Sequence, residues 1–237
     1  MLKKILPFLL ISFWTCSGLD AGFITIDDFS NFQSLSVYGT DSGTSTVSAS
    51  GSLGGYRTFS INSVVNDNDP ESRARLRTFN NLIGLSSDAL VEPAWSIKWA
   101  GASGTGFTPT NFIDTPSGIN SELRFTVLTS DHSGTFNWTL TDTSGKLATY
   151  SVNIQSSLTS VDYAARFVDF NTQADFDWEQ VKAVELKGSG VEEWDYTMTG
   201  SIITAVPEPS FISTLLATAI VFSSGIRRRA PRQEDLI

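Results

Sequence analysis

The feature that most constrains the fold of this chain is a series of short segments in which apolar and polar residues alternate. Every second residue is apolar in Trp95-Ser96-Ile97-Lys98-Trp99 and in Phe136-Asn137-Trp138-Thr139-Leu140, and 122–128 repeats the pattern. A period of two residues places successive side chains on opposite faces of a β-strand. Each segment therefore has one face for a hydrophobic core and one for solvent.

Turn-forming residues separate these segments, as in Asp131-His132-Ser133-Gly134 and Asp142-Thr143-Ser144-Gly145. The other predicted strands are 23–26, 45–50, 56–65, 73–79, 147–154, 165–170, 181–186 and 196–203, with the polar segment 45–50 at a sheet edge. Many short strands without a long helical pattern predict an all-β fold, an antiparallel β-sandwich of the jelly-roll type. In a jelly roll we expect the first and last strands to pair.

Residues 1–21 have the pattern of a secretory signal peptide. Lys3 and Lys4 precede an apolar stretch from Ile5 to Trp14, and small residues follow as far as Ala21. The apolar stretch is too short for a good membrane span, which needs about 20 residues. An alternative is a lipoprotein signal acylated at Cys16, although Phe13-Trp14-Thr15 is bulky where such signals carry small residues.

Residues 206–232 combine three features in a fixed order. Pro207-Glu208-Pro209 comes first, a largely apolar stretch at 211–226 follows, and the arginines Arg227, Arg228, Arg229 and Arg232 come last. Sixteen helical residues would extend about 24 Å, a short transmembrane helix whose arginines reach the membrane interface. Arginines stay on the cytoplasmic side, so the rest of the chain is expected outside.

This tripartite end resembles the PEP-CTERM sorting signal of Gram-negative bacteria. The resemblance implies recognition by an exosortase-type membrane protease and cleavage near Pro207, Glu208 and Pro209. It also implies release or attachment at the cell surface, commonly alongside exopolysaccharide systems. The expected location is the cell envelope, cell surface or extracellular matrix, with a membrane anchor before processing.

Residues 22–205 are expected to form one domain, because no repeat or linker divides them. Three of their motifs resemble a recurring type of uncharacterised exported protein that carries the same tail: Ile26-Asp27-Asp28-Phe29, Leu53-Gly54-Gly55-Tyr56-Arg57 and Asp175-Phe176-Asp177-Trp178. Similar first and last strands occur in jelly-roll carbohydrate-binding and galactose-binding-like domains. The resemblance implies a fold and a compartment, because fold alone does not give a ligand.

The charge and the scarcity of histidine and cysteine restrict the chemistry of this domain. It has ten Lys and Arg residues against 21 Asp and Glu residues, a formal charge of −11, which disfavours nucleic acid as a partner. Cys16 lies in the signal peptide and His132 in a predicted turn, so zinc and Ser-His-Asp sites lack their residues. We therefore expect no enzyme; the alternative is a carbohydrate-active enzyme with two carboxylates, a glycoside hydrolase or lyase on the jelly-roll scaffold.

A structural calcium ion is one candidate ligand, since Ca²⁺ takes oxygen ligands from loops and strand ends. If the first and last strands pair, Asp27 or Asp28 could approach Asp195. The alternative is ordinary turn chemistry, in which Asp side chains bind nearby backbone N–H groups. No other cofactor is predicted.

Glycan binding is the other candidate function, and it would require exposed aromatic rings with polar neighbours. Trp95, Trp99 and Trp138 alternate with polar residues and are predicted to lie in the core. Trp178 and Trp194 lie in acidic, loop-like segments and are the predicted glycan-binding residues, with burial under a loop as the alternative for both. The sequence thus predicts an exported structural, adhesive or glycan-binding protein, or a passive matrix component.

Overall fold

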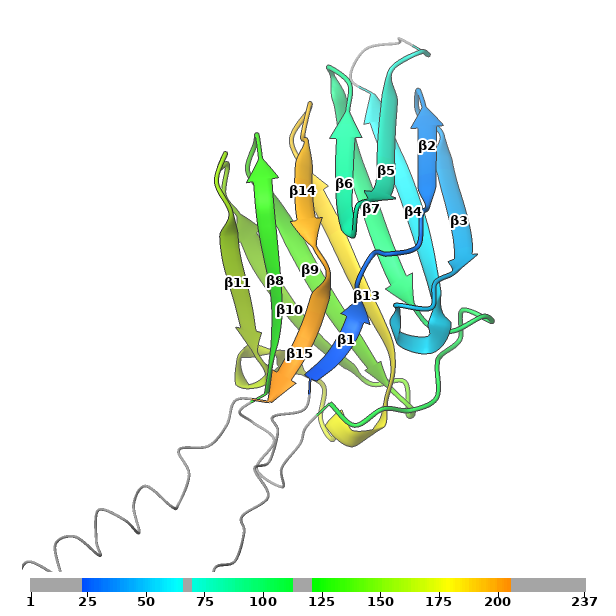
Figure 1. Ribbon diagram of the computed structural model, residues 1–237, viewed down its shortest axis with the longest axis vertical. Coiled ribbons are helices and arrows are strands. Elements are labelled where there is room, and N and C mark those ends of the chain that lie inside the picture. Colours follow the sequence, from blue (N-terminus) through cyan, green and yellow to red (C-terminus); the bar gives the residue numbers. More distant parts are fainter. Residues whose placement is uncertain (1–22, 66–69, 113–120, 206–237) are drawn as a thin grey trace, which may run out of the picture.

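The computed structural model describes residues 23–65, 70–112 and 121–205, and in these residues fifteen strands form two antiparallel sheets packed face to face (Figure 1). The strands are β1 (Phe23–Asp27), β2 (Ser34–Tyr38), β3 (Ser42–Ser48), β4 (Tyr56–Val65), β5 (Arg73–Phe79), β6 (Leu82–Ser87), β7 (Val91–Trp99), β8 (Ser121–Ser130), β9 (Gly134–Asp142), β10 (Leu147–Ile154), β11 (Val161–Arg166), β12 (Asn171–Thr172), β13 (Val181–Gly190), β14 (Tyr196–Thr199) and β15 (Ser201–Ala205). Three short 3₁₀ helices accompany them: η1 (Leu53–Gly55), η2 (Phe167–Asp169) and η3 (Trp178–Gln180).

The sheets confirm the predicted antiparallel β-sandwich. Sheet A has the strand order β1-β15-β8-β14-β6-β5-β2, and β11 pairs with the other edge of β8. Sheet B has the order β12-β10-β9-β13-β7-β4-β3, so the polar strand β3 lies at an edge as predicted. The first strand, β1, pairs with the last, β15, in the arrangement expected of a jelly roll.

The core follows from the alternation read in the sequence. In β7, every odd-numbered residue is buried and the even-numbered ones are more exposed, so Trp95, Ile97 and Trp99 face sheet A. Trp138 of β9 is also buried, and its ring stacks on that of Trp99 with 6.2 Å between centroids. The prediction that these three tryptophans lie in the core is confirmed.

Some predicted strands differ from the structure. The predicted strand 165–170 is displaced, because β11 ends at Arg166 and the chain then turns through η2. The predicted strand 196–203 divides into β14 and β15 at Gly200, where a Cβ atom would lie 2.2 Å from the backbone oxygen of Asp27. Strands β2 and β6 were not predicted, because serine and glycine weaken their apolar signal.

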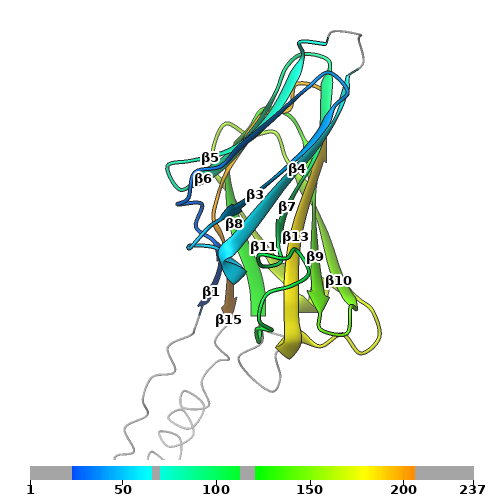
Figure 2. The same ribbon diagram turned by 90° about the vertical axis from the view of Figure 1, so that its right-hand side faces the viewer.

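The two ends of the sandwich domain lie together. Phe23 pairs with Thr204, and Figure 2 shows β1 and β15 side by side at one end of the sandwich. The predicted signal peptide, the sorting motif Pro207, Glu208 and Pro209 and the cluster Arg227, Arg228 and Arg229 lie outside the described residues. Within 23–65, 70–112 and 121–205, we find no helix with the length and apolar character of a membrane span.

Candidate functional site

A hollow of about 450 Å³ lies on the outer face of sheet A, over β6 and β14. Its floor is made of small residues: Gly84 and Ser86 of β6, and Thr197 of β14, which pairs with Gly84. Arg77 and Phe79 of β5 form one side of it. Thr129, Asp131, Leu158 and Asp195 line the other side, and the buried residues Leu85 and Tyr196 also contribute to the lining. The hollow exists because larger side chains flank a floor that is almost bare backbone.

Phe79 provides an aromatic ring in this hollow. Along β5 the even-numbered residues are buried and the odd-numbered ones are at least partly exposed, so Phe79 shares the outer face with Arg77. The guanidinium carbon of Arg77 lies 4.9 Å from the centroid of the Phe79 ring. A Cβ atom at Gly84 would lie 3.0 Å from Phe79 Cε1, so the ring rests against the backbone of Gly84. Ring and guanidinium together form a surface stabilised by a cation–π interaction.

Two carboxylates line the end of the hollow that adjoins the loops. Asp131 Oδ1 accepts a hydrogen bond from the backbone N–H of Asp195 at 2.8 Å, and Asp195 Oδ1 accepts one from the N–H of Ser87 at 2.9 Å. Partial burial raises the pKa of the Asp195 carboxyl; the Ser87 N–H opposes this rise, and the neighbouring carboxylates of Asp131 and Asp88 add to it. In both Asp131 and Asp195, the second carboxylate oxygen, Oδ2, takes no part in these two hydrogen bonds.

A second hollow of about 360 Å³ adjoins the first along β14. Thr197 lines the first hollow and Thr199 the second, and these two residues are alternate positions of one strand. Thr126 and Asp162 also line the second hollow, where Thr126 Oγ1 donates a hydrogen bond to Asp162 Oδ1 at 2.6 Å. The outer face of sheet A therefore carries two hollows, one on each side of β14.

The outer face of sheet B differs in its chemistry. Its central row of cross-strand neighbours is Thr44, Ser60, Ser96, Lys187, Asn137 and Ser151. A hollow of about 500 Å³ lies over this face, and the aromatic residue among its lining, Trp95, is buried at 3% exposure. The lining of this hollow offers hydroxyl, amide and ammonium groups but no accessible ring, so the hollow on sheet A is the stronger candidate for a binding site.

The two tryptophans predicted to bind a glycan, Trp178 and Trp194, differ in burial. Trp194 is 0% exposed: its Nε1 donates to Ser130 Oγ at 2.9 Å, and its ring covers the backbone of Gly134 and Gly190. The prediction that Trp194 forms an exposed platform is therefore wrong. Trp178 is half-buried, and one face of its ring stacks on Phe167 with 4.2 Å between centroids. Trp178 can offer a partner only the part of its ring that this stack leaves open.

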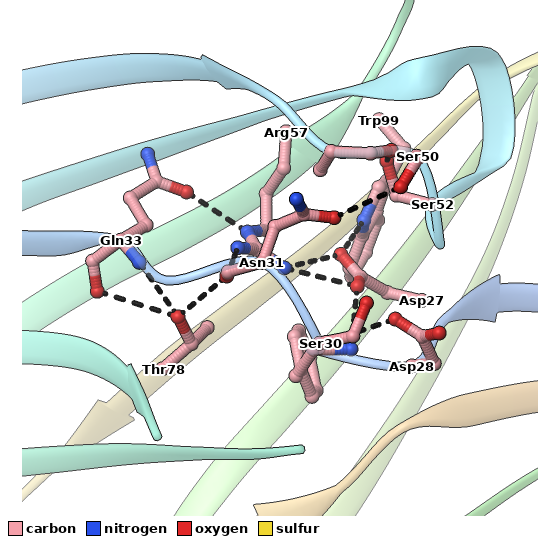
Figure 3. A network of polar contacts seen from close by, with 12 residues as sticks. Asp27, Asp28, Ser30, Asn31, Gln33, Ser50, Ser52, Arg57, Thr78 and Trp99 are labelled. Carbon is pink, nitrogen blue, oxygen red and sulfur yellow. Dashed lines mark hydrogen bonds and ion pairs between the residues drawn. The ribbon is translucent and has the colours of Figure 1, made fainter. Parts of the chain in front are cut away.

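Asp27 belongs to a buried network that joins two of the sequence motifs (Figure 3). Arg57 Nη1 donates to Asp27 Oδ1 and to Asp27 Oδ2, both at 2.9 Å, and Trp99 Nε1 donates to Asp27 Oδ2 at 2.7 Å. Arg57 Nε donates to Gln33 Oε1 at 2.8 Å. Burial raises the pKa of the Asp27 carboxyl, while Arg57 and the hydrogen bonds from Trp99 and the Phe29 N–H oppose this rise. The network fastens the first strand to β4 and β7.

The predicted calcium site is not formed by Asp27, Asp28 and Asp195. Asp27 is occupied by Arg57 and Trp99, and the exposed Asp28 accepts the N–H of Ser30. Asp195 precedes β14 and lies beside Ser87, whereas Asp27 ends β1 beside β15. In the described part of the chain, no three acidic, histidine or cysteine residues are grouped as metal ligands. A local turn accounts for Asp28, a hydrogen bond to the backbone of β6 accounts for Asp195, and an ion pair accounts for Asp27.

Sequence reasoning missed the residues of the hollow, although a signal for Phe79 was present. In Arg73-Ala74-Arg75-Leu76-Arg77-Thr78-Phe79, the aromatic residue falls in the same phase as the arginines and not with the buried positions. A large ring at the polar positions of a strand indicates a ring that is at least partly exposed, as Phe79 is. The second side of the hollow had no such signal, because Thr129, Asp131 and Leu158 come together only through the pairing of β8 with its neighbours.

In sequence, the chain matches no protein-family model and no curated protein. Its fold is similar to a family 11 carbohydrate-binding module from Clostridium thermocellum, in complex with a β-1,3-1,4-mixed-linked tetrasaccharide. The identity is 12% and the TM-score 0.41, over 79% of this chain and 98% of that module. An agarase, AgWH50C, gives 9% identity and a TM-score of 0.44, over 80% of this chain and 25% of the agarase.

This chain also covers only 22% of the length of PfGH50B, at 11% identity and a TM-score of 0.43. These likenesses concern a shared β-sandwich architecture. At identities of 9–12% and TM-scores of 0.41–0.44 they assign neither a ligand nor an activity to this chain.

Proposed function

We propose that this chain is an exported protein displayed at the surface or in the extracellular matrix of a Gram-negative bacterium, where its sandwich domain binds a glycan through the hollow on sheet A. The observation that carries the glycan proposal is the half-buried ring of Phe79, with the guanidinium carbon of the exposed Arg77 4.9 Å from its centroid, beside a floor of small residues. Export and exosortase sorting rest on the pattern of the two ends of the sequence.

The chemistry of the hollow suits a sugar ring. The C–H face of a pyranose stacks on an aromatic ring, and its hydroxyls need donors and acceptors around the edge. Phe79 offers the part of its ring that Arg77 and Gly84 leave open, while Ser86, Thr129 and Thr197 offer hydroxyls within the same lining. The volume of about 450 Å³ falls in the range of ligand sites, and the open form admits one segment of a longer polymer.

Affinity electrophoresis of the full chain in gels containing neutral and acidic polysaccharides tests this proposal. Phe79→Ala should weaken the retardation about tenfold or more, because one stacked ring contributes about 1–3 kcal/mol in comparable sites. Phe23→Ala is the matched control, since Phe23 is 68% exposed and lies at the far end of β1. Equal retardation of Phe79→Ala and the wild type would exclude this site, and no retardation in any polysaccharide would favour a passive matrix component.

A carbohydrate-active enzyme is the second candidate, and the observation in its favour is that Asp131 and Asp195 line one hollow. The raised pKa of Asp195 is the property required of a general acid. Against this, both carboxylates already accept backbone N–H groups of neighbouring segments, Asp131 that of Asp195 and Asp195 that of Ser87. Incubation of the wild type with each retained polysaccharide, followed by a reducing-end assay, separates the two functions. Hydrolysis that disappears in Asp195→Asn would establish the enzyme.

A further inference from the structure

We infer that the glycan bound at this site is an anionic polysaccharide, and that it lies along the outer face of β5 against Arg73, Arg75 and Arg77. This inference rests on the proposed glycan-binding function and names its ligand class. The three arginines occupy alternate positions of one strand, in the same phase as Phe79. From Arg73 to Phe79 this row, here called the arginine stripe, extends about 20 Å at the usual rise of a strand.

The arginine stripe concentrates positive charge that is scarce in this domain. Residues 22–205 contain only ten Lys and Arg residues against 21 acidic residues, and three of the ten are in this row. Like charges at neighbouring positions of a sheet destabilise the fold, so the row has an electrostatic cost. A polymer with regularly spaced carboxylates would remove that cost on binding and would gain charge-assisted hydrogen bonds to the guanidinium groups.

The neighbours of Arg75 and Arg77 within the sheet are small or hydroxyl residues, whereas Arg73 lies beside Asp88, whose Oδ2 accepts the backbone N–H of Arg73 at 2.9 Å. On β2, Ser34, Ser36 and Tyr38 pair with Arg77, Arg75 and Arg73, in that order. On β6, Ser86 pairs with Arg75 and Gly84 with Arg77. The ion pairs between described residues involve Arg57, Arg124, Lys146 and Lys187, none of which belongs to the stripe.

Local contacts orient the guanidinium groups of Arg75 and Arg77 without neutralising them. Arg75 Nε donates to Ser34 Oγ at 3.3 Å, and Arg77 stacks on Phe79 at 4.9 Å. Tyr38, 51% exposed, lies across from Arg73 at the other end of the row. The stripe therefore has an aromatic ring at each end and cations between them, arranged along an extended strand.

The acidic side of the hollow does not obstruct this path. Asp131 and Asp195 belong to segments that flank β8 and β14, and β6 lies between β14 and the arginine stripe. A polymer placed on β5 has the cations beneath it and the carboxylates of Asp131 and Asp195 to one side, with Asp88 beside the Arg73 end of the stripe. Charge complementarity thus selects the β5 side of the hollow for an acidic chain.

Binding of the full chain to polygalacturonic acid and to its methyl ester tests the inference, because the ester keeps the sugar backbone and removes the charge. The wild type should bind the acid at least about tenfold more tightly than the ester, and the preference should shrink as ionic strength rises from about 0.05 M to about 0.5 M. The triple variant Arg73→Gln/Arg75→Gln/Arg77→Gln should lose this preference. Arg166→Gln, on the exposed end of β11, is the control for a charge removed elsewhere on sheet A.

The outcomes separate this inference from the function on which it rests. Equal binding to acid and ester, lost in Phe79→Ala, would overturn the anionic ligand and keep the glycan site. Binding to neither polymer would contradict both the anionic ligand and the proposed glycan site. Equally tight, stripe-dependent binding to anionic lipid vesicles would overturn the polysaccharide as the specific ligand. If the triple variant has a lowered melting temperature, Arg→Lys at the same three positions retains the charge and should retain the preference for the acid.

Discussion

The buried ion pair of Asp27 and Arg57 shows how single residues organise this domain. Both side chains are almost fully inaccessible, and the guanidinium lies between the rings of Phe29 and Phe59, at 5.3 Å and 5.2 Å from their centroids. Removing two charges from water is costly, so the pair is tolerated only with its hydrogen bonds complete. Asp27 accepts from Arg57, Trp99 and the N–H of Phe29, which meets that condition.

Breaking one half of this pair should be more damaging than replacing both halves. Arg57→Met leaves the Asp27 carboxylate buried without its cation, and we expect a loss of about 3–5 kcal/mol in the free energy of unfolding. Arg57→Met combined with Asp27→Asn should recover a large part of that loss, since no uncompensated charge remains. Urea unfolding followed by tryptophan fluorescence measures both values. Additive losses in the double variant would show that the two side chains stabilise the domain independently.

Asp195 should make the stability of the domain depend on pH. Its raised pKa means that the folded state holds this proton more tightly than the unfolded state, so ionisation destabilises the fold as the pH rises above about 4. Asp195→Asn keeps an oxygen for the Ser87 N–H and removes repulsion from Asp131 and Asp88. It should therefore stabilise the domain at pH 7, by less than about 1 kcal/mol because the site is partly exposed. Thermal unfolding from pH 3 to pH 8 should show this advantage vanishing at the acid end; an advantage independent of pH would contradict the assignment.

The role of individual residues was the least predictable level from sequence. Asp27 was expected to approach Asp195, but its partner is Arg57, 30 positions away, and no local pattern indicates that contact. Trp194 lies in an acidic segment that suggested exposure, yet Gly134 and Gly190 leave room for its ring in the core. Such assignments depend on the strand pairing, which short alternating segments do not specify.

At the scale of elements, the sequence predicted strands well where alternation was strong. The predicted bounds of β4, β5 and β10 agree with the structure. Prediction failed for β2 and β6, which are rich in serine, and for the end of β11, where η2 replaces the expected extension. The apolar residues after Arg166 lie in a turn, where Phe167 and Phe170 are buried in the core. Apolar character alone therefore did not distinguish this turn from a strand.

Strand β13 is positioned against β7 by the packing of Trp95 on Gly188. These residues are cross-strand partners, and a Cβ atom at Gly188 would lie 2.0 Å from Trp95 Cζ2. Gly188→Ala should therefore force the indole to move and lower the free energy of unfolding by about 1–3 kcal/mol. Ser189→Ala is the matched control, because Ser189 is exposed on the outer face of the same strand. Wild-type stability of Gly188→Ala in chemical denaturation would show that the core accommodates a methyl group there.

At the scale of the whole molecule, the pairing of β1 with β15 decides how the domain can be presented. Phe23 and Thr204 are neighbours, so the described domain begins and ends at the same end of the sandwich. A tether at that end leaves the outer faces of both sheets unobstructed. The hollow and the arginine stripe, on sheet A, would remain accessible on a domain held at a surface.

Processing of the C-terminal segment should depend on the tripeptide Pro207, Glu208 and Pro209. In cells with an exosortase-type protease, we expect the mature protein to lack both the signal peptide and the arginine cluster at Arg227, Arg228 and Arg229. Prolines before an apolar helix keep the backbone extended and accessible to a protease, whereas alanines would let the helix continue into the tripeptide. Replacing all three residues with alanine should therefore leave the tail attached and the protein in the membrane fraction.

Intact-mass measurement of protein from the membrane and extracellular fractions decides this prediction. Replacing Ser213 and Thr214 with alanine alters the apolar stretch without touching the tripeptide, and this control should be processed like the wild type. Because β15 ends at Ala205, cleavage near the tripeptide would leave the pairing of β15 with β1 complete, and the released domain should unfold at the same temperature as the tethered one. Recovery of the unprocessed chain from the cytoplasm, with its arginines intact, would contradict export and the surface role proposed for the hollow.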